Sequence, residues 1–119
     1  MSPSAPSPRE FDPAGEWAAE LAELQQRRAQ ARAMGGPEAL AKFKASGRLN
    51  ARERIAALLD ADSFRELGSL AGKGHYSREG VFERIDPTNA IVGTGRIQGR
   101  KVALHVDDFT IRAGSSEGT

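Results

Sequence analysis

A chain of 119 residues without cysteine has no disulfides and no cysteine-ligated metal, and its two histidines argue against a zinc centre. A net charge of +1, with 39% hydrophobic and 28% charged residues, indicates a folded, soluble chain without overall attraction to nucleic acid or anionic membranes. No apolar run approaches the ~20 residues of a membrane helix, and the first residues lack the apolar core of a signal peptide, so we expect a cytoplasmic protein.

The chain is expected to begin with a leader and a helix. Residues 1–13 contain four prolines among serines, which predicts a disordered leader because so little apolar surface can be buried. Residues 16–33 predict a helix with one apolar stripe, in which Glu23 pairs with Arg27 one turn later. The stripe consists of Trp17, Leu21 and Leu24. Two glycines that follow the helix are expected to end it.

Two further helices are expected. Residues 37–46 begin with proline, which suits the first position of a helix, and place Leu40 and Phe43 inward. Asn50 is placed to cap a third helix, and Glu53 three residues later completes a capping box. The buried face of this third helix is expected to consist of Ile55, Leu58 and Leu59.

The second half of the chain predicts strands. Residues 64–70 form a short apolar segment whose type stays open, and residues 72–87 are polar, contain glycine and predict a loop. Residues 89–97 and 100–111 predict two strands joined by a two-residue turn at Gln98 and Gly99. Apolar residues at 102, 104 and 106 alternate with their neighbours, as expected for a half-buried strand. The expected fold class is therefore α+β, with helices followed by a β-hairpin.

Basic residues concentrate in one stretch of the chain. Residues 27–54 hold eight basic and two acidic side chains, a local charge of +6, so the remaining residues are net acidic. Such a stretch suits a polyanionic ligand or an acidic partner surface, and it also suits a solvated helix face. Composition leaves both interpretations open.

The other candidate motifs are interpreted as structural and not as functional. The glycines at 93, 95 and 99 have the wrong spacing for a dinucleotide loop and lie in a strand, where they indicate close backbone approach or a bulge. Asp107 and Asp108 are adjacent in a strand, so their carboxylates point to opposite faces, and we expect one to bond backbone or an arginine. His75 and His105 have no nucleophile nearby in sequence.

Several ordered motifs lie at residues 35–40, 47–49, 51–55, 58–60, 63–67, 93–100 with Val102, 108–110 and 114–115. Together they resemble the start of the carboxyltransferase (beta) subunit of biotin-dependent acyl-CoA carboxylases of the acetyl-/propionyl-CoA carboxylase type. The resemblance covers about residues 24–118. The resemblance implies that residues 14–119 are the N-terminal part of a crotonase-like CoA carboxyltransferase domain.

The implied activity is transfer of a carboxyl group from carboxybiotin to the α-carbon of a short acyl-CoA. In such enzymes the biotin anion takes the α-proton and backbone N–H groups hold the thioester enolate, so this segment is not expected to supply a catalytic side chain. Carboxybiotin would come from a biotin carboxylase or biotin carrier subunit, and none would be bound by this segment alone. The implied partners also include the acyl-CoA and further carboxyltransferase subunits in a homo-oligomer, but no nucleic acid and no membrane.

Candidate ligand-binding residues follow from the resemblance. The 3′-phosphate and pyrophosphate of CoA need cationic partners, for which arginine is well shaped. We expect some of these arginines to face the CoA entrance or a neighbouring subunit: Arg27, Arg28, Arg48 and Arg52. Gly114 and Ser115 lie in a terminal loop that can present backbone N–H groups to an anion, or else form a flexible chain end. No metal ligand is expected.

The sequence departs from the family in two ways. Ala113 stands where the family usually has glycine, which restricts the loop if that position needs a positive φ. Family members are also far longer, so we expect a truncated segment that is inactive and weakly folded alone. The alternative hypothesis is a stand-alone, non-catalytic interaction module of a carboxylase assembly.

Overall fold

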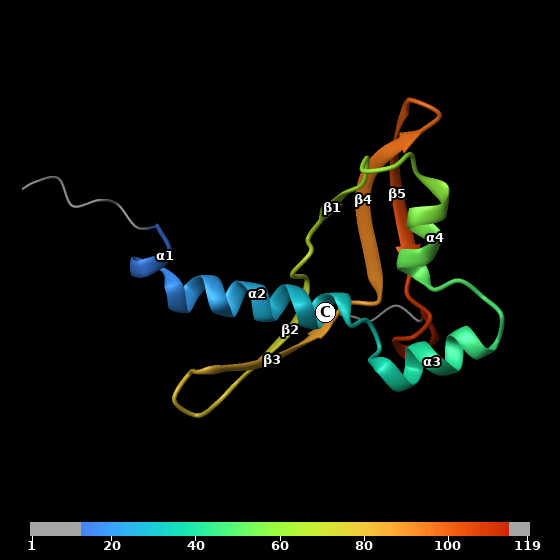
Figure 1. Ribbon diagram of the computed structural model, residues 1–119. Helices are drawn as coiled ribbons and strands as arrows, with labels where there is room; N and C mark the ends of the chain where they lie inside the picture. Colours follow the sequence, from blue (N-terminus) through green and yellow to red (C-terminus); the bar gives the residue numbers. More distant parts are fainter. Residues whose placement is uncertain (1–12, 115–119) are drawn as a thin grey trace, which may run out of the picture.

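The computed structural model describes residues 13–114 and has the expected α+β fold, with helices first in the chain and strands second (Figure 1). The helices are α1 (Pro13–Glu16), α2 (Ala18–Arg32), α3 (Pro37–Ala45) and α4 (Ala51–Leu58). The strands are β1 (Arg65–Leu67), β2 (Gly72–Tyr76), β3 (Phe82–Pro87), β4 (Ala90–Ile97) and β5 (Arg100–Asp107), followed by the short 3-10 helix η1 (Arg112–Gly114). Residues 1–12 of the predicted leader lie outside the described residues. No described helix is both long and apolar enough to cross a membrane.

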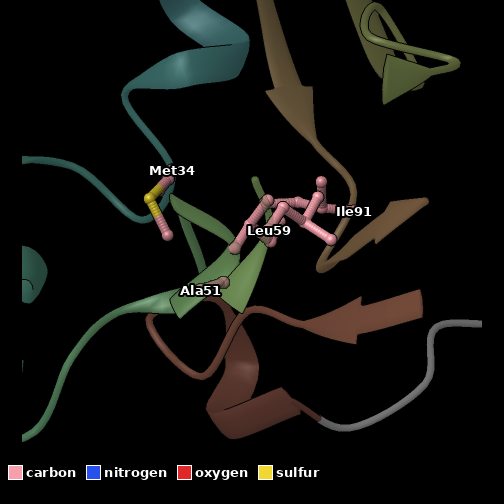
Figure 2. Close-up of a cluster of buried hydrophobic side chains, with 5 residues drawn as sticks. Met34, Ala51, Leu59 and Ile91 are labelled. Atoms are coloured by element: carbon pink, nitrogen blue, oxygen red, sulfur yellow. The ribbon is translucent and has the colours of Figure 1, made fainter. Parts of the chain in front are cut away.

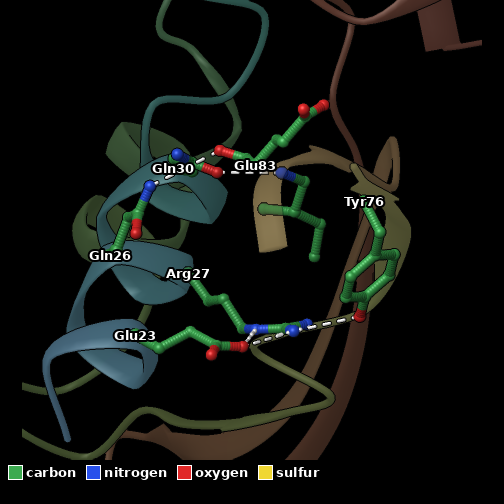
Figure 3. A network of polar contacts seen from close by, with 7 residues as sticks. Glu23, Gln26, Arg27, Gln30, Tyr76 and Glu83 are labelled. Carbon is green, nitrogen blue, oxygen red and sulfur yellow. Dashed lines mark hydrogen bonds and ion pairs between the residues drawn. The ribbon is translucent and has the colours of Figure 1, made fainter. Parts of the chain in front are cut away.

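The helix predicted over residues 16–33 is present as α2, but its apolar stripe is not buried. Trp17 is 55% exposed and Leu21 is 42% exposed, so this part of the stripe faces solvent. Helix α2 instead lies along the β2–β3 hairpin, which it contacts through polar side chains (Figure 3). The side-chain oxygen of Gln30 accepts a hydrogen bond from the backbone N–H of Ile85 at 2.8 Å. Such contacts leave no trace in the hydrophobic period of a helix.

The capping box of α4 is confirmed. The side chain of Asn50 accepts a hydrogen bond from the N–H of Glu53 at 3.0 Å, and the Glu53 carboxylate accepts one from the N–H of Asn50 at 3.2 Å. These two bonds satisfy backbone donors that a helix start leaves unpaired. Ile55 and Leu59 are buried as predicted, whereas Leu58 is 56% exposed and its predicted burial is wrong.

The predicted hairpin is confirmed as β4 and β5, although β5 ends at Asp107 and not at residue 111; β4 is the central strand of a three-stranded antiparallel sheet in the order β1-β4-β5. Gln98 and Gly99 form the turn of the hairpin, both with positive φ (49° and 79°), as the favoured two-residue turn requires. The Asp60 carboxylate accepts hydrogen bonds from both turn N–H groups at 2.9 and 2.8 Å. Strand β1 supplies the third strand from the segment whose type the sequence left open.

The loop predicted over residues 72–87 is wrong, because β2 and β3 pair there as a second, two-stranded antiparallel sheet. His75 lies opposite Arg84, and its Nε2 is 2.6 Å from a carboxylate oxygen of Asp86. This contact lowers the pKa of Asp86 below its ordinary value, with a smaller contribution from the nearby Arg84. Most residues of the hairpin are exposed, so no alternation of apolar and polar residues marks the strands.

The hydrophobic core lies between α4 and one face of the three-stranded sheet (Figure 2). Its buried members are Met34, Ala51, Ile55, Leu59 and Ile91, drawn from the turn after α2, from α4 and its end, and from β4. Apolar residues of β5 pack against this cluster from the same face of the sheet. Because a single helix covers a single face, the opposite face of the sheet stays open in the described part of the chain.

Two glycines in β4 allow this close packing. A Cβ atom added at Gly93 would lie 2.5 Å from the backbone oxygen of Arg65 and 2.6 Å from the ring of Phe64. One added at Gly95 would lie 2.5 Å from a methyl group of Leu59. Both glycines are buried on the core side of the strand, which confirms the prediction of close approach.

We therefore expect the substitution Gly93→Ala to lower the free energy of unfolding by about 1–3 kcal/mol, the usual cost of an overpacked core. The clash involves a backbone oxygen, so a side-chain rotation cannot relieve it, and β1 must move away from β4. Urea unfolding measures the loss, and hydrogen exchange at the amides of β1 locates it.

The matched control is Val92→Thr, one residue earlier on the exposed face of β4. It retains a branched side chain and should change the unfolding free energy by no more than about 0.5 kcal/mol. Equal effects of the two substitutions would contradict the close approach at residue 93.

A second constraint lies at the end of the described chain. Ala113 adopts φ 51° and ψ 32°, the left-handed conformation that strains every residue with a Cβ. The preceding Arg112 also has a positive φ of 46°. The predicted restriction at residue 113 is therefore real, because this loop position does need a positive φ.

Replacing Ala113 with glycine should raise the free energy of unfolding by about 1 kcal/mol, because glycine adopts this conformation without strain. The same change in an ordinary strand conformation, Ala103→Gly in β5, should instead lower it by about 0.5–1 kcal/mol. Urea unfolding of the two variants gives the comparison. A shift of the same sign in both would show that residue 113 is not strained.

Candidate functional site

A groove of about 500 Å³ lies between the start of α4 and the turn that follows β5. Two arginines, Arg48 and Arg54, and two phenylalanines, Phe43 and Phe109, line it. Its volume lies within the range of small-molecule sites. The groove therefore combines cationic groups with apolar surface, as expected for a ligand that has charged and planar parts, and Asp107 and the buried Asp108 also line it.

Arg48 is held in place by aromatic rings and not by an acid. Its guanidinium carbon lies 4.8 Å from the centre of the Phe43 ring and 5.9 Å from that of Phe109. Its Nε donates a hydrogen bond to the hydroxyl of Ser46 at 3.2 Å. A cation over an aromatic face gains about 0.5–1 kcal/mol at an exposed site. The terminal N–H groups of Arg48 are consequently oriented without being neutralised.

The opposite side of the groove is fixed by Asp108, which is only 1% exposed. Its carboxylate accepts hydrogen bonds from the backbone N–H of Thr110 at 2.9 Å and from the Thr110 hydroxyl at 2.6 Å. The backbone N–H of Asp108 donates to the carbonyl of Asn89 at 2.6 Å. The Thr110 hydroxyl also accepts a hydrogen bond from the N–H of Gly35 at 3.0 Å, which ties the turn after β5 to the turn after α2.

The neighbouring carboxylates do not form an acid–base pair. Asp107 is exposed and lies 3.2 Å from Nε2 of His105 on the same strand, whereas Asp108 is buried in its turn. The structural interpretation of Asp108 is therefore confirmed. Within residues 13–114, no three His, Cys, Asp or Glu side chains come together in a group that would hold a metal ion.

Arg27, a predicted ligand-binding residue, fastens the hairpin to α2 (Figure 3). It donates hydrogen bonds to Glu23 at 2.6 Å and to the hydroxyl of Tyr76 at 3.0 Å, and its guanidinium lies 3.9 Å from the centre of the Phe82 ring. The bonds to Tyr76 and Glu23 raise the pKa of Arg27 above its ordinary value. The predicted pair with Glu23 is confirmed, and these contacts give Arg27 a structural role.

Arg52, also a predicted ligand-binding residue, is paired within the protein. It donates two hydrogen bonds to the carboxylate of Glu66, at 3.0 and 3.1 Å, and both side chains are largely buried. A two-pronged contact of this kind uses the arginine geometry that would otherwise recognise a phosphate. Arg52 therefore joins α4 to β1 and has limited capacity for a ligand.

The remaining predicted residues lie apart from one another. Arg28 is exposed on α2, and Gly114 lies beside Phe109 in a groove that adjoins the groove of Arg48. Ser115 lies outside the described residues. The structure thus places Arg48 and Gly114 each near the ring of Phe109, and it places Arg27 and Arg52 in separate contacts.

Arg54 and Phe109 are among the groove residues that were absent from the predicted ligand-binding residues. Arg54 belongs to the basic stretch, and it lines both the groove of Arg48 and the adjoining one beside Gly114. Phe109 lies within a motif of the resemblance but gave no chemical signal as a sequence feature. Its position between Arg48 and Gly114 appears only when the turn after β5 is folded.

Comparisons with known proteins agree with this architecture. The family described as carboxyl transferase domain matches residues 42–119. The chain is 42% identical, over 99 residues, to the biotin-dependent acetyl-/propionyl-coenzyme A carboxylase beta5 subunit of Mycobacterium tuberculosis (strain H37Rv). It is 33% identical, over 92 residues, to the methylmalonyl-CoA decarboxylase subunit alpha of Veillonella parvula. The matched regions cover 82% and 77% of this chain, and 18% of each relative.

Solved structures show the same fold. A crystal structure of transcarboxylase 12S, described as a hexamer with hydrolysed methylmalonyl-coenzyme A bound, superposes with a TM-score of 0.68 at 32% identity. The superposition covers 82% of this chain and 19% of that one. The helices and the sheet are therefore those of the start of a crotonase-like carboxyltransferase. The chain belongs to the carboxyl transferase domain family.

Proposed function

We propose that residues 14–119 form the N-terminal part of an acyl-CoA carboxyltransferase that moves a carboxyl group from carboxybiotin to the α-carbon of a short acyl-CoA. Membership of the carboxyl transferase domain family is the observation that carries this proposal. The chain spans about a fifth of the length of the relatives that it matches. The proposal therefore assigns to this segment a share of the substrate site and leaves the reacting centre to residues beyond it.

The share assigned to this segment is contact with the phosphates of CoA. Arg48 and Arg54 supply cationic donors in one groove, and Arg48 has no acid as a partner there. Charge-assisted hydrogen bonds from arginine to phosphate are strong and can be two-pronged. Gly114, which lines the adjoining groove, and Ser115 after it keep the proposed role of presenting backbone N–H groups to an anion.

Carboxybiotin, on this proposal, is delivered by the carrier domain of a biotin-dependent partner subunit and supplies the carboxyl group. The groove residues of this chain orient the acyl-CoA and do not take part in proton transfer. The biotin dependence of the mycobacterial relative and the hexamer of transcarboxylase 12S support a biotin carrier subunit and further carboxyltransferase subunits as partners. We place this assembly in the cytoplasm.

Charge reversal of Arg48 tests the groove. In the protein as isolated from its source cells, Arg48→Glu should raise the KM for acyl-CoA about tenfold or more and leave kcat almost unchanged. The reason is that a charge-assisted hydrogen bond contributes about 1.5–3 kcal/mol to binding of both substrate and transition state. Steady-state kinetics of carboxyl transfer at several acyl-CoA concentrations measure both constants.

The matched control is Lys42→Glu, on α3 and outside the lining of the groove, which should leave the KM nearly unchanged. Arg52→Glu is less informative, because it also leaves the carboxylate of Glu66 without its partner. An unchanged KM in Arg48→Glu would contradict CoA binding by this residue. It would favour the interpretation of the basic stretch as a solvated helix face.

The length of the polypeptide tests the proposal as a whole. The intact mass of the protein that carries this sequence in its source cells should lie well above the 12.7 kDa calculated for 119 residues. Mass spectrometry of the protein captured from those cells gives the answer. A mass near 12.7 kDa would exclude catalysis by this molecule and would favour a non-catalytic module of a carboxylase assembly.

A further inference from the structure

A second groove, of about 620 Å³, lies on the open face of the three-stranded sheet, opposite the core. It is lined by Arg65 of β1, Arg96 of β4 and Lys101 of β5, with Thr94 among them. All four residues are exposed, and their strands place them on the face turned away from α4. None of them belongs to the basic stretch at residues 27–54.

The cations of this groove are poorly neutralised. Within residues 13–114, the side chains of Arg65 and Lys101 have no hydrogen-bond or ion-pair partner, and the Arg96 side chain makes one hydrogen bond, to the carbonyl of Gly99 at 3.2 Å. Asp62 is the single acidic residue in the lining, so three cations face one anion. The groove therefore has a net charge of +2.

The arrangement of two of these cations opposes folding. Arg96 and Lys101 are direct partners in the β4–β5 register. Side chains that lie directly opposite on one face have Cβ atoms about 4.5–5.5 Å apart, and like charges at that distance destabilise the pair. A hairpin selected for stability alone would carry an acid at one of the two positions. The repulsion is relieved if an anion binds between them.

We propose that this groove binds a small molecule carrying a phosphate or diphosphate group, at a site separate from the groove of Arg48. The guanidinium groups of Arg65 and Arg96 supply forked donors, Lys101 supplies a point charge, and the hydroxyl of Thr94 supplies a neutral donor. The site goes beyond the proposed function and does not depend on it.

The shape of the groove favours a small anion over a protein partner. Stable protein interfaces are centred on large buried apolar or aromatic anchors. Among the described residues, the lining of this groove contains no large exposed apolar side chain; its other members include Gly95, Val102 and Ala103. Donors for an anion are present, whereas an anchor for an acidic segment of protein is not.

The test is calorimetric titration of the protein, as isolated from its source cells, with inorganic pyrophosphate at about 0.15 M salt. Saturating CoA is present so that any CoA site is already filled. We expect pyrophosphate to bind under these conditions, and Arg65→Gln to weaken its affinity about tenfold, as the loss of a charge-assisted bond predicts.

The decisive variant is Lys101→Glu. The new glutamate faces Arg96, so the cross-strand repulsion becomes an attraction and the melting temperature rises while pyrophosphate binding is lost. A more stable protein that no longer binds cannot be explained by misfolding. The matched control is Arg78→Glu in the turn between β2 and β3, which makes the same change in net charge outside the groove and should retain binding.

Three outcomes would overturn the proposal. The first is the absence of pyrophosphate binding in the presence of CoA, which includes displacement of pyrophosphate by CoA. The second is an equal loss of affinity in Arg78→Glu and Lys101→Glu, which would reduce the effect to general charge attraction. The third is retained binding in Lys101→Glu. None of these outcomes affects the kinetic test of Arg48, so failure of this site and failure of the proposed function are distinguishable.

Discussion

The fold depends on the absence of side chains at Gly93 and Gly95, on the core-facing side of β4. Gly93 and Gly95 leave room for the ring of Phe64, for β1 and for the side chain of Leu59, so that one short helix can seal a narrow sheet. Dispersion contacts fall off steeply with distance, and a core with so few buried residues depends on this proximity. The register of the hairpin is set at the same time, because a shift of one residue would turn these glycines toward solvent.

The geometry of the groove of Arg48 depends on this register. Pairing of β4 with β5 brings Asn89 beside Asp108, and the buried carboxylate of Asp108 then fixes the turn that carries Phe109. The rings of Phe43 and Phe109 in turn hold the guanidinium of Arg48. A cation positioned by aromatic faces keeps its donors available, whereas Arg52, positioned by a carboxylate, does not. Arg48 and Arg52 carry the same charge, and they differ in the groups that they contact.

Elements that rest on local chemistry could be predicted from the sequence. The cap of α4 and the turn at Gln98 and Gly99 depend on residues within a few positions of each other, and β5 shows its alternation directly. The β2–β3 hairpin could not be predicted, because it is held by Arg27 and Gln30 from about fifty residues earlier. The candidate site shows the same difference between features that nearby residues predict and contacts that depend on distant residues. Charge and resemblance singled out Arg48 together with Arg27 and Arg52, but the contact of Arg27 with Tyr76, the pairing of Arg52 with Glu66 and the proximity of Arg54 exist only in the folded chain.

Strand β5 forms one border of the three-stranded sheet in the described part of the chain, so one row of its backbone donors and acceptors meets no further strand. Such a border recruits strands from other molecules unless charge keeps them away. Lys101, His105 and Asp107 lie along the exposed face of β5 and provide that protection. Because ionic strength screens exposed charges, concentrated salt weakens this protection along the described edge of β5.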